Sequence, residues 1–289
     1  MGLGMGAIKM TLELYQKGIL KDTHSVMEMG SQGLHISIPD LEELLQMAGL
    51  SNYRKKDFGN LKRWPEGSCS SKVFYEILGI KEYACIDLCG GYGAIDWDLN
   101  RPWEDKSYEN KYDLVTDHGT NEHVFNTAEA YRTMHRLCKP GGLLVILQAP
   151  CRGNGYFAFE PLFFTKMSEA NDYKILFSSY LVTPAVLTPH GSAHQYHVPV
   201  SGELIDALDW SKVSHLGIAY VMQKQSKADF RYPKQENDLS KSQQRVDYLL
   251  QFLQGPPEHS YVPLAPESVR GKHFIAECRR RIYSRIKSR

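Results

Sequence analysis

The sequence predicts an α/β protein with a doubly wound, mostly parallel sheet. Short apolar segments of strand length alternate with segments in which apolar residues recur every three or four positions, which is typical of buried strands separated by amphipathic helices. Apolar residues make up 42% of the 289 positions, enough for a sizeable core. Together with only 23% charged residues, this composition excludes disorder as the main state of the chain.

The first eighty residues contain one strand pattern among helical patterns. Apolar residues spaced by four, three and four positions from Ile8 to Ile19 share one helical face. An apolar run further on leads directly into a turn with Gly30 and Gly33. The expected elements are a helix over 7–20, a short strand and its turn over 25–36, a helix followed by a polar, basic loop over 39–62, and a helix over 71–78.

Four strand signals follow, and the remaining chain adds two more. A Lys-Pro-Gly-Gly turn at 139–142 precedes the fourth signal, and Pro161 is suited to open a helix as its first residue. The expected strands cover 83–88, 94–99, 112–116, 143–148, 175–182 and 213–222, with helices from about Thr127, from Pro161, over 240–254 and over 272–286.

These elements predict a seven-stranded sheet with helices on both faces, followed by a C-terminal helical extension. The main domain is expected over 1–224, with an insertion at about 37–70 and an acceptor-site region over 151–210. The extension over 225–289 is basic, because its Lys and Arg outnumber its Asp and Glu by 13 to 7.

Acidic residues and glycines stand where several predicted strands end. Gly30 follows the first strand, and Asp87, Asp98 and Asp117 follow later ones. Ligands of doubly wound sheets bind beyond the carboxyl ends of the strands. A ribose needs a carboxylate that accepts from its hydroxyl groups, and a glycine turn lets the backbone approach the ligand closely. The arrangement therefore favours an adenosine-containing ligand.

Three segments resemble class I S-adenosylmethionine-dependent methyltransferases, over roughly residues 24–182. The segment 112–124 ends in Glu-His-Val and resembles the fourth-strand segment of that family. The segment 137–145, with its Lys-Pro-Gly-Gly turn, resembles the turn into the fifth strand, and 98–102 resembles the third-strand acid. The resemblance implies a Rossmann-like fold, methyltransferase activity and S-adenosylmethionine as cofactor.

Two glycine segments compete for the role of the cofactor loop. Residues 86–93 look superficially more like that loop, but only 50 residues separate Gly91 from Gly141, too few for the intervening strands and helices. The 111 residues from Gly30 to Gly141 accommodate them with an insertion. We therefore place the loop at 28–33, although Ser31 and Gln32 replace the middle glycine of the usual motif. The glycines at 90, 91 and 93 are interpreted as a tight connection between strands.

The resemblance then implies a set of site residues. Asp87 is expected to bind the ribose, Asp98 the adenine side, and His118 to lie near the sulfonium. His123 is the candidate catalytic residue, a general base for a hydroxyl acceptor. The predicted cofactor-binding residues are Glu28, Gly30, Ser31, Gln32, Asp87, Leu88, Asp98, Leu99, Asp117 and His118.

The predicted reaction is methyl transfer to an oxygen, rather than a nitrogen, of a small or carrier-linked acceptor such as a sugar or natural-product intermediate. Two alternatives stay open. The first is a catalytically silent relative that only binds S-adenosylmethionine. The second is a nicotinamide-dependent oxidoreductase, whose G-x-G-x-x-G fingerprint is reduced here to Gly30 and Gly33.

Other partners are judged from charge and spacing. His190, His194 and His197 suggest a metal site, but Pro189 and Gly191 break any helix that would align them, so no metal is predicted. A net charge of +1 gives no sign of a nucleic-acid partner, and no apolar run is long enough to span a membrane. Scattered cysteines fit a reducing cytoplasm. The terminal helices are candidate surfaces for a homo-oligomer.

Overall fold

A computed structural model of the chain describes residues 2–51, 53, 58, 69–88 and 91–234. The helices predicted over 240–254 and 272–286 lie outside these residues, as does most of the predicted C-terminal extension. None of the helices in the described part is long and apolar enough to cross a membrane.

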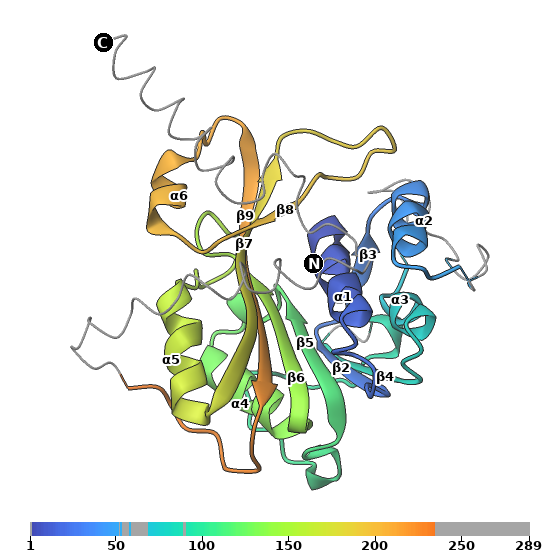
Figure 1. Ribbon diagram of the computed structural model, residues 1–289. Helices are drawn as coiled ribbons and strands as arrows, with labels where there is room; N and C mark the ends of the chain where they lie inside the picture. Colours follow the sequence, from blue (N-terminus) through green and yellow to red (C-terminus); the bar gives the residue numbers. More distant parts are fainter. Residues whose placement is uncertain (1, 52, 54–57, 59–68, 89–90, 235–289) are drawn as a thin grey trace.

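A mixed sheet of seven strands forms the centre of the molecule (Figure 1). β2 lies between β4 and β5 and is parallel to both, and β6 continues the parallel pairing. β9 is antiparallel to β6 and β7, and β8 is antiparallel to β7. The order across the sheet is β4 (Glu82–Ile86), β2 (Ser25–Met29), β5 (Tyr112–His118), β6 (Cys138–Gln148), β9 (Val213–Lys224), β7 (Tyr173–Pro184) and β8 (Tyr196–Val198).

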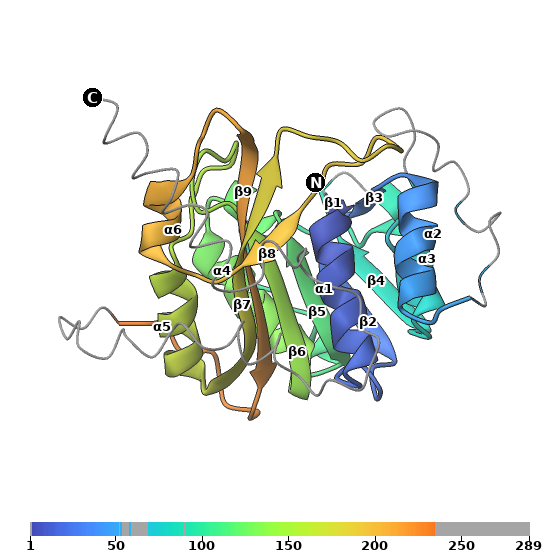
Figure 2. The same ribbon diagram turned by 45° about the horizontal axis from the view of Figure 1, so that its top comes forward.

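Helices cover both faces of the sheet, which confirms the predicted fold class (Figure 2). One buried cluster joins α1 (Met5–Gln16), α2 (Ile38–Met47) and α3 (Lys72–Ile77) to one face. The other cluster joins α4 (Thr127–Leu137), α5 (Pro161–Asn171) and α6 (Gly202–Ala207) to the opposite face. Both sides of the parallel strands are therefore buried, as their continuous apolar sequences require.

Local sequence signals account for the helix ends near the site. Ser37 precedes α2, and its hydroxyl accepts a hydrogen bond of 3.3 Å from the amide of Asp40, which is a usual N-terminal cap. Pro161 stands in the first turn of α5, as predicted, and the helix ends at Asp172 in a left-handed conformation with φ of 53°.

The strand predicted over 94–99 is wrong. Among the described residues of this segment, Ile95 alone pairs with the sheet, through a parallel bridge to Ile86. The chain turns away because Asp98 caps a local turn, accepting hydrogen bonds from the amide of Asn100 at 2.9 Å and from its side chain at 2.7 Å. Leu99 is then buried in the second core cluster rather than paired in the sheet.

A small parallel pair of strands was not predicted. β1 (Gly2–Gly4) pairs with β3 (Gly33–His35), so the segment 25–36 holds two strands separated by the turn at 30–32. Three-residue strands rich in glycine give no alternating pattern. This pair carries the first residues of the chain to the carboxyl edge of the main sheet.

Candidate functional site

The loops that follow β2, β4 and β5 lie side by side, because β2 pairs with both of the other strands. Parallel strands end at the same edge of the sheet, so the turn at 30–32, the segment from Asp87 and the loop 119–123 meet there. This is the edge at which a doubly wound sheet binds its ligands.

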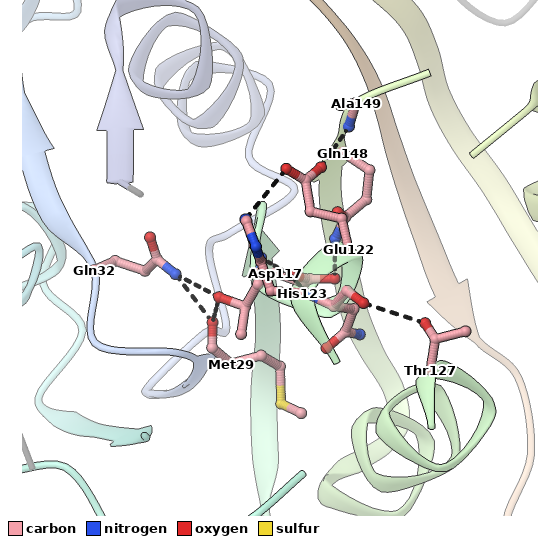
Figure 3. A network of polar contacts seen from close by, with 10 residues as sticks. Met29, Gln32, Asp117, Glu122, His123, Thr127, Gln148 and Ala149 are labelled. Atoms are coloured by element: carbon pink, nitrogen blue, oxygen red, sulfur yellow. Dashed lines mark hydrogen bonds and ion pairs between the residues drawn. The ribbon is translucent and has the colours of Figure 1, made fainter. Parts of the chain in front are cut away.

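Gly30 brings the first of these loops close to the last. Its φ is +85°, and a Cβ at this position would lie 2.3 Å from Oγ1 of Thr120. That hydroxyl donates a hydrogen bond of 2.6 Å to the carbonyl of Met29, and Nε2 of Gln32 donates to both the same carbonyl and Thr120 Oγ1 (Figure 3). Glycine is needed both for the backbone conformation and for the space. The buried Oε1 of Gln32 has no hydrogen-bond partner among the described residues.

Asp87 joins the segment after β4 to the turn after β2. Its Oδ2 accepts a hydrogen bond of 2.8 Å from the amide of Ser31. The second glycine segment lies against the same turn, since a Cβ at Gly91 would be 3.3 Å from Oγ of Ser31. Leu88 is largely exposed. The two glycine segments that compete in sequence are therefore neighbours, while Gly90 lies outside the described residues.

Asp98 and Leu99 lie in the turn that replaces the predicted strand. The hydrogen bonds from Asn100 lower the pKa of Asp98 below its usual value. Asn100 also bonds to Asn126, just before α4, through its side chain at 2.9 Å and its carbonyl at 3.0 Å. Among the described hydrogen bonds, none joins Asp98 to the turn at Gly30. The adenine role of Asp98 and Leu99 stays a prediction.

The carboxyl group of Glu28 lies between β4 and the residue that precedes α3. Its Oε2 accepts hydrogen bonds from Oγ of Ser71 at 2.5 Å and from the hydroxyl of Tyr83 at 2.8 Å. The side chain has no exposed surface, and this burial raises its pKa to about 7. In this structure the carboxylate ties β2 to α3 and β4.

Asp117 holds the loop after β5. Its Oδ1 accepts hydrogen bonds from the amides of Thr120 at 2.9 Å and Asn121 at 3.2 Å, and its Oδ2 accepts one from the side chain of Gln148 (Figure 3). Burial raises the pKa of this carboxyl to about 7. Its contribution to a binding site is to position the loop that carries Thr120.

A cavity of about 280 Å³ opens at the same edge, between the ends of β5, β6 and β9 and the first residues of the chain. Its wall combines glycines, apolar side chains, polar side chains and the carboxyl group of Glu122. The lining residues are Gly2, Gly4, Met5, His35, His118, Gly119, Glu122, Leu147, Gln148, Ala149, Asn154, Leu181, Ala193, Gln195, His215 and Gly217.

His118 is the predicted site residue that the structure places most deeply in this cavity wall. It is 3% exposed, and neither ring nitrogen has a hydrogen-bond partner among the described residues. Burial lowers the pKa of the imidazole to about 4, so the ring is neutral at neutral pH.

His123, the candidate base, lies beside the cavity rather than in its lining. Its Nε2 is 3.5 Å from Oε1 of Glu122, which does line the cavity (Figure 3). The other carboxylate oxygen of Glu122 accepts a hydrogen bond of 2.8 Å from the amide of Ala149. The catalytic role of His123 is not tested by this geometry and stays a prediction.

Sequence reasoning missed His35, Gln195 and His215 as cavity residues. They come from β3, from the segment before β8 and from β9, so only the fold brings them together. No local motif marks them.

The histidines at 190, 194 and 197 do not form one cluster of ligands. His197 is buried, with ring nitrogens 2.6 Å from Oγ of Ser179 and 2.9 Å from the carbonyl of Gly6. His194 stacks on Tyr196. The described part of the chain contains no group of three histidine, cysteine or acidic side chains arranged to hold a metal ion.

Comparison with known proteins relates one part of the chain to methyltransferases. A family profile for a methyltransferase domain matches residues 100–146. The matched stretch holds β5, α4 and most of β6, together with Glu122-His123-Val124 and the turn at 139–142. The match supports a methyltransferase domain. No curated protein matches the chain in sequence.

Solved structures with a similar arrangement include two methyltransferases. One is an S-adenosylmethionine-dependent methyltransferase from Archaeoglobus fulgidus, whose sequence is 12% identical to this one. The superposition covers 75% of this chain and 93% of that chain, with a TM-score of 0.39. The other is the 1,6-didemethyltoxoflavin-N1-methyltransferase of Burkholderia thailandensis, with bound 1,6-didemethyltoxoflavin and S-adenosylhomocysteine. It has 11% identity, 75% of this chain and 80% of that chain covered, and a TM-score of 0.36.

Proposed function

We propose that this methyltransferase transfers a methyl group to an oxygen atom of a small or carrier-linked acceptor, such as a sugar or a natural-product intermediate. The observation that carries the proposal is the cavity at the end of β5, whose wall holds Gly119, the neighbour of Thr120, and a buried His118 with no hydrogen-bond partner among the described residues. Donor and acceptor must meet in line and with little water between them, and a partly open cavity next to the loop after β5 can align them.

The residues around Gly30 fit the cofactor. S-adenosylmethionine supplies a methyl group on a sulfonium, which a nucleophile can attack. The Oε1 of Gln32, which is buried and has no hydrogen-bond partner among the described residues, suits a polar ligand lying close to this turn. The turn 30–32 would hold the methionine part, and Asp87 with Leu88 would hold the ribose. Asp87 is already placed by the amide of Ser31.

Glu122 and His123 are the groups proposed to handle the acceptor proton. Glu122 reaches the cavity, and His123 lies 3.5 Å behind one of its oxygens. An imidazole at this place is proposed to take the proton that leaves an acceptor hydroxyl. A hydroxyl of high pKa needs such a base, whereas a more acidic acceptor needs only alignment.

The local structure does not favour the nicotinamide alternative. Dinucleotide sites place the glycine turn directly before a helix, whose N-terminus binds the pyrophosphate. Here Gly33 enters β3, and α2 begins only at Ile38. A catalytically silent relative stays as the alternative that the experiment must exclude.

The test is calorimetry with S-adenosylmethionine, S-adenosylhomocysteine and NAD in parallel, followed by turnover assays across hydroxyl and amine acceptors. We expect the first two ligands to bind, NAD not to bind, and methylation of a hydroxyl acceptor. Binding of the demethylated cofactor without turnover on any acceptor would favour the silent relative. Methylation confined to amines would overturn the oxygen assignment.

A further inference from the structure

We propose that His118 binds the hydroxyl group of the acceptor, and that the acceptor part held in the cavity is an uncharged group of about one ring. The inference rests on the proposed function, which it makes more specific. Four observations support it: the unmet hydrogen bonds of His118, the charge of the wall, its apolar surfaces and its rigidity.

His118 stands at the carboxyl end of β5, opposite Leu147 of β6, and both residues line the cavity. It is nearly completely buried, yet neither Nδ1 nor Nε2 has a hydrogen-bond partner among the described residues. Buried polar groups in folded proteins are nearly always paired. A neutral imidazole offers one donor and one acceptor, and a hydroxyl group can satisfy either nitrogen, since it both accepts and donates.

The charge of the wall selects against anionic acceptors. None of the described residues that line the cavity is Lys or Arg. Burial lowers the pKa of His35 to about 4. Burial also lowers the pKa of His215, so both imidazoles favour the neutral form. Glu122 contributes a carboxylate to the wall. The described wall residues would therefore offer a phosphate or carboxylate on the acceptor no Lys or Arg side chain and one carboxylate of like charge.

Apolar surfaces and size define the rest of the acceptor. Met5, Leu147 and Leu181 give the wall apolar surface. A volume of about 280 Å³ lies just below the usual range for drug-sized ligands, so it suits a single small ring. A larger or carrier-linked acceptor would place only its terminal ring inside.

The wall is held by hydrogen bonds between distant segments, which keeps the cavity formed before binding. Oε1 of Gln195 accepts a hydrogen bond of 2.7 Å from the amide of Gly6, in the first turn of α1. Oγ1 of Thr188 donates to Asp40 of α2 at 2.7 Å. The segment between β7 and β8 is thus fixed to the N-terminal helices, and Ala193 and Gln195 line the cavity from it.

The experiment follows the His118 ring by NMR of the full chain labelled with ¹⁵N-histidine, the signal being assigned from the His118→Gln variant. The probes are three single rings of similar size: phenol, anisole and benzoate. We expect phenol to shift the His118 signal, anisole to bind about tenfold more weakly because it has no hydroxyl hydrogen, and benzoate to leave the signal unchanged.

Variants of His118 distinguish a hydrogen bond to phenol from simple filling of the cavity. Phenol affinity, measured by calorimetry, should fall about tenfold in His118→Phe and recover in part in His118→Gln, which keeps polar atoms at this place. His24→Phe is the matched control, because His24 is exposed at the opposite end of β2. Equal phenol affinity in the wild type and His118→Phe, or a His118 shift with benzoate as large as that with phenol, would overturn the proposal. So would the absence of any phenol-induced shift.

Binding of S-adenosylhomocysteine, measured on the same samples, keeps the two proposals distinct. If the wild type does not bind S-adenosylhomocysteine, this result counts against the methyltransferase assignment, whether or not phenol shifts the His118 signal. Normal cofactor binding with no response of His118 to phenol counts against the acceptor proposal alone.

Discussion

Thr120 donates its hydroxyl hydrogen to the carbonyl of Met29 at 2.6 Å and so links the loop after β5 to the last residue of β2. The two residues lie 91 positions apart in sequence. Because the same hydroxyl accepts from Gln32, it fixes the turn that is expected to hold the methionine end of the cofactor. The proposed cofactor loop is thus shaped by a residue of the methyltransferase-like segment 100–146.

Replacing Thr120 by valine tests this link. Thr120→Val keeps the shape but removes one donor and one acceptor, and it leaves the Met29 carbonyl and Gln32 short of a partner. We expect a loss of about 1–3 kcal/mol in the free energy of unfolding and weaker binding of S-adenosylhomocysteine, measured by denaturation and calorimetry. Thr165→Val is the control, since that hydroxyl donates to the carbonyl of Pro161 within α5. Equal effects of the two substitutions would show that the link has no special role.

The two glycine segments can be ranked by substitution. Gly30→Val should abolish cofactor binding, because φ of +85° is unfavourable for a β-branched residue and Thr120 occupies the space of the new side chain. Gly91→Ala should have a milder effect, since its Cβ would lie 3.3 Å from Ser31 Oγ.

Calorimetry with S-adenosylhomocysteine measures the ranking, and circular dichroism checks that both variants fold. A stronger loss of binding in Gly91→Ala would move the cofactor loop to the second glycine segment.

Asp87→Ala tests the predicted ribose site. Removing a charged acceptor of two ribose hydroxyls should weaken cofactor binding by about 2–4 kcal/mol. Asp96→Ala is the matched control, because Asp96 is exposed nearby in the same segment. Unchanged affinity in a folded Asp87→Ala variant would place the ribose elsewhere. Asp87 also accepts a hydrogen bond from the amide of Ser31, so Asp87→Ala removes support of the turn together with the ribose contact. Asp87→Asn should keep the bond to Ser31, and a loss of cofactor affinity in this variant would therefore report direct binding of the ribose.

Glu28 gives a prediction for the dependence of stability on pH. Burial raises its pKa in the folded protein to about 7, above the ordinary 4.5 expected when unfolded. The folded state therefore prefers the protonated carboxyl, and this contribution to stability is complete below about pH 4.5 and lost as the pH rises through about 7. Glu28→Gln removes the buried charge, so it should raise the melting temperature more at pH 8 than at pH 5.

The comparison of wild type and variant cancels the similar contribution of Asp117. Glu76→Gln serves as control, because it makes the same replacement at an exposed position of α3. A melting temperature that falls equally at both pH values in Glu28→Gln would show that the hydrogen bonds to Ser71 and Tyr83 outweigh the buried charge.

The long, apolar elements could be predicted from the sequence. The short elements, whose structure depends on contacts with distant parts of the chain, could not. β2, β4, β5, β6, β7 and β9 each follow from a buried apolar run. The strand at 94–99 failed because its alternation is also compatible with a turn capped by Asp98. β1, β3 and β8 have three residues each, too few for a periodic signal.

The residues of the candidate site could likewise be predicted only in part from the sequence. Gly30 and Asp87 could be selected because strand ends in a parallel sheet converge, and the structure joins the turn at Gly30 to Asp87 through Ser31. Glu28 lies in the same motif, but the pleat of β2 directs its carboxylate to Ser71 and Tyr83. His35 and Gln195 reach the cavity only through tertiary packing, which no local pattern encodes.

His123 yields the sharpest functional prediction. It follows Glu122, whose carboxylate lines the cavity, and its Nε2 lies 3.5 Å from Oε1 of that residue, which places the imidazole next to the cavity wall. As a general base, His123 should matter for the chemical step and not for cofactor binding. We expect His123→Ala to lower turnover about 10²–10⁴-fold with nearly unchanged affinity for S-adenosylhomocysteine.

His194→Ala is the control, because His194 is a partly exposed histidine that does not line the cavity. A lower melting temperature with normal turnover per folded molecule would make His123 a structural residue. Deprotonation would then depend on Glu122, or on the acceptor itself being acidic enough to react once aligned.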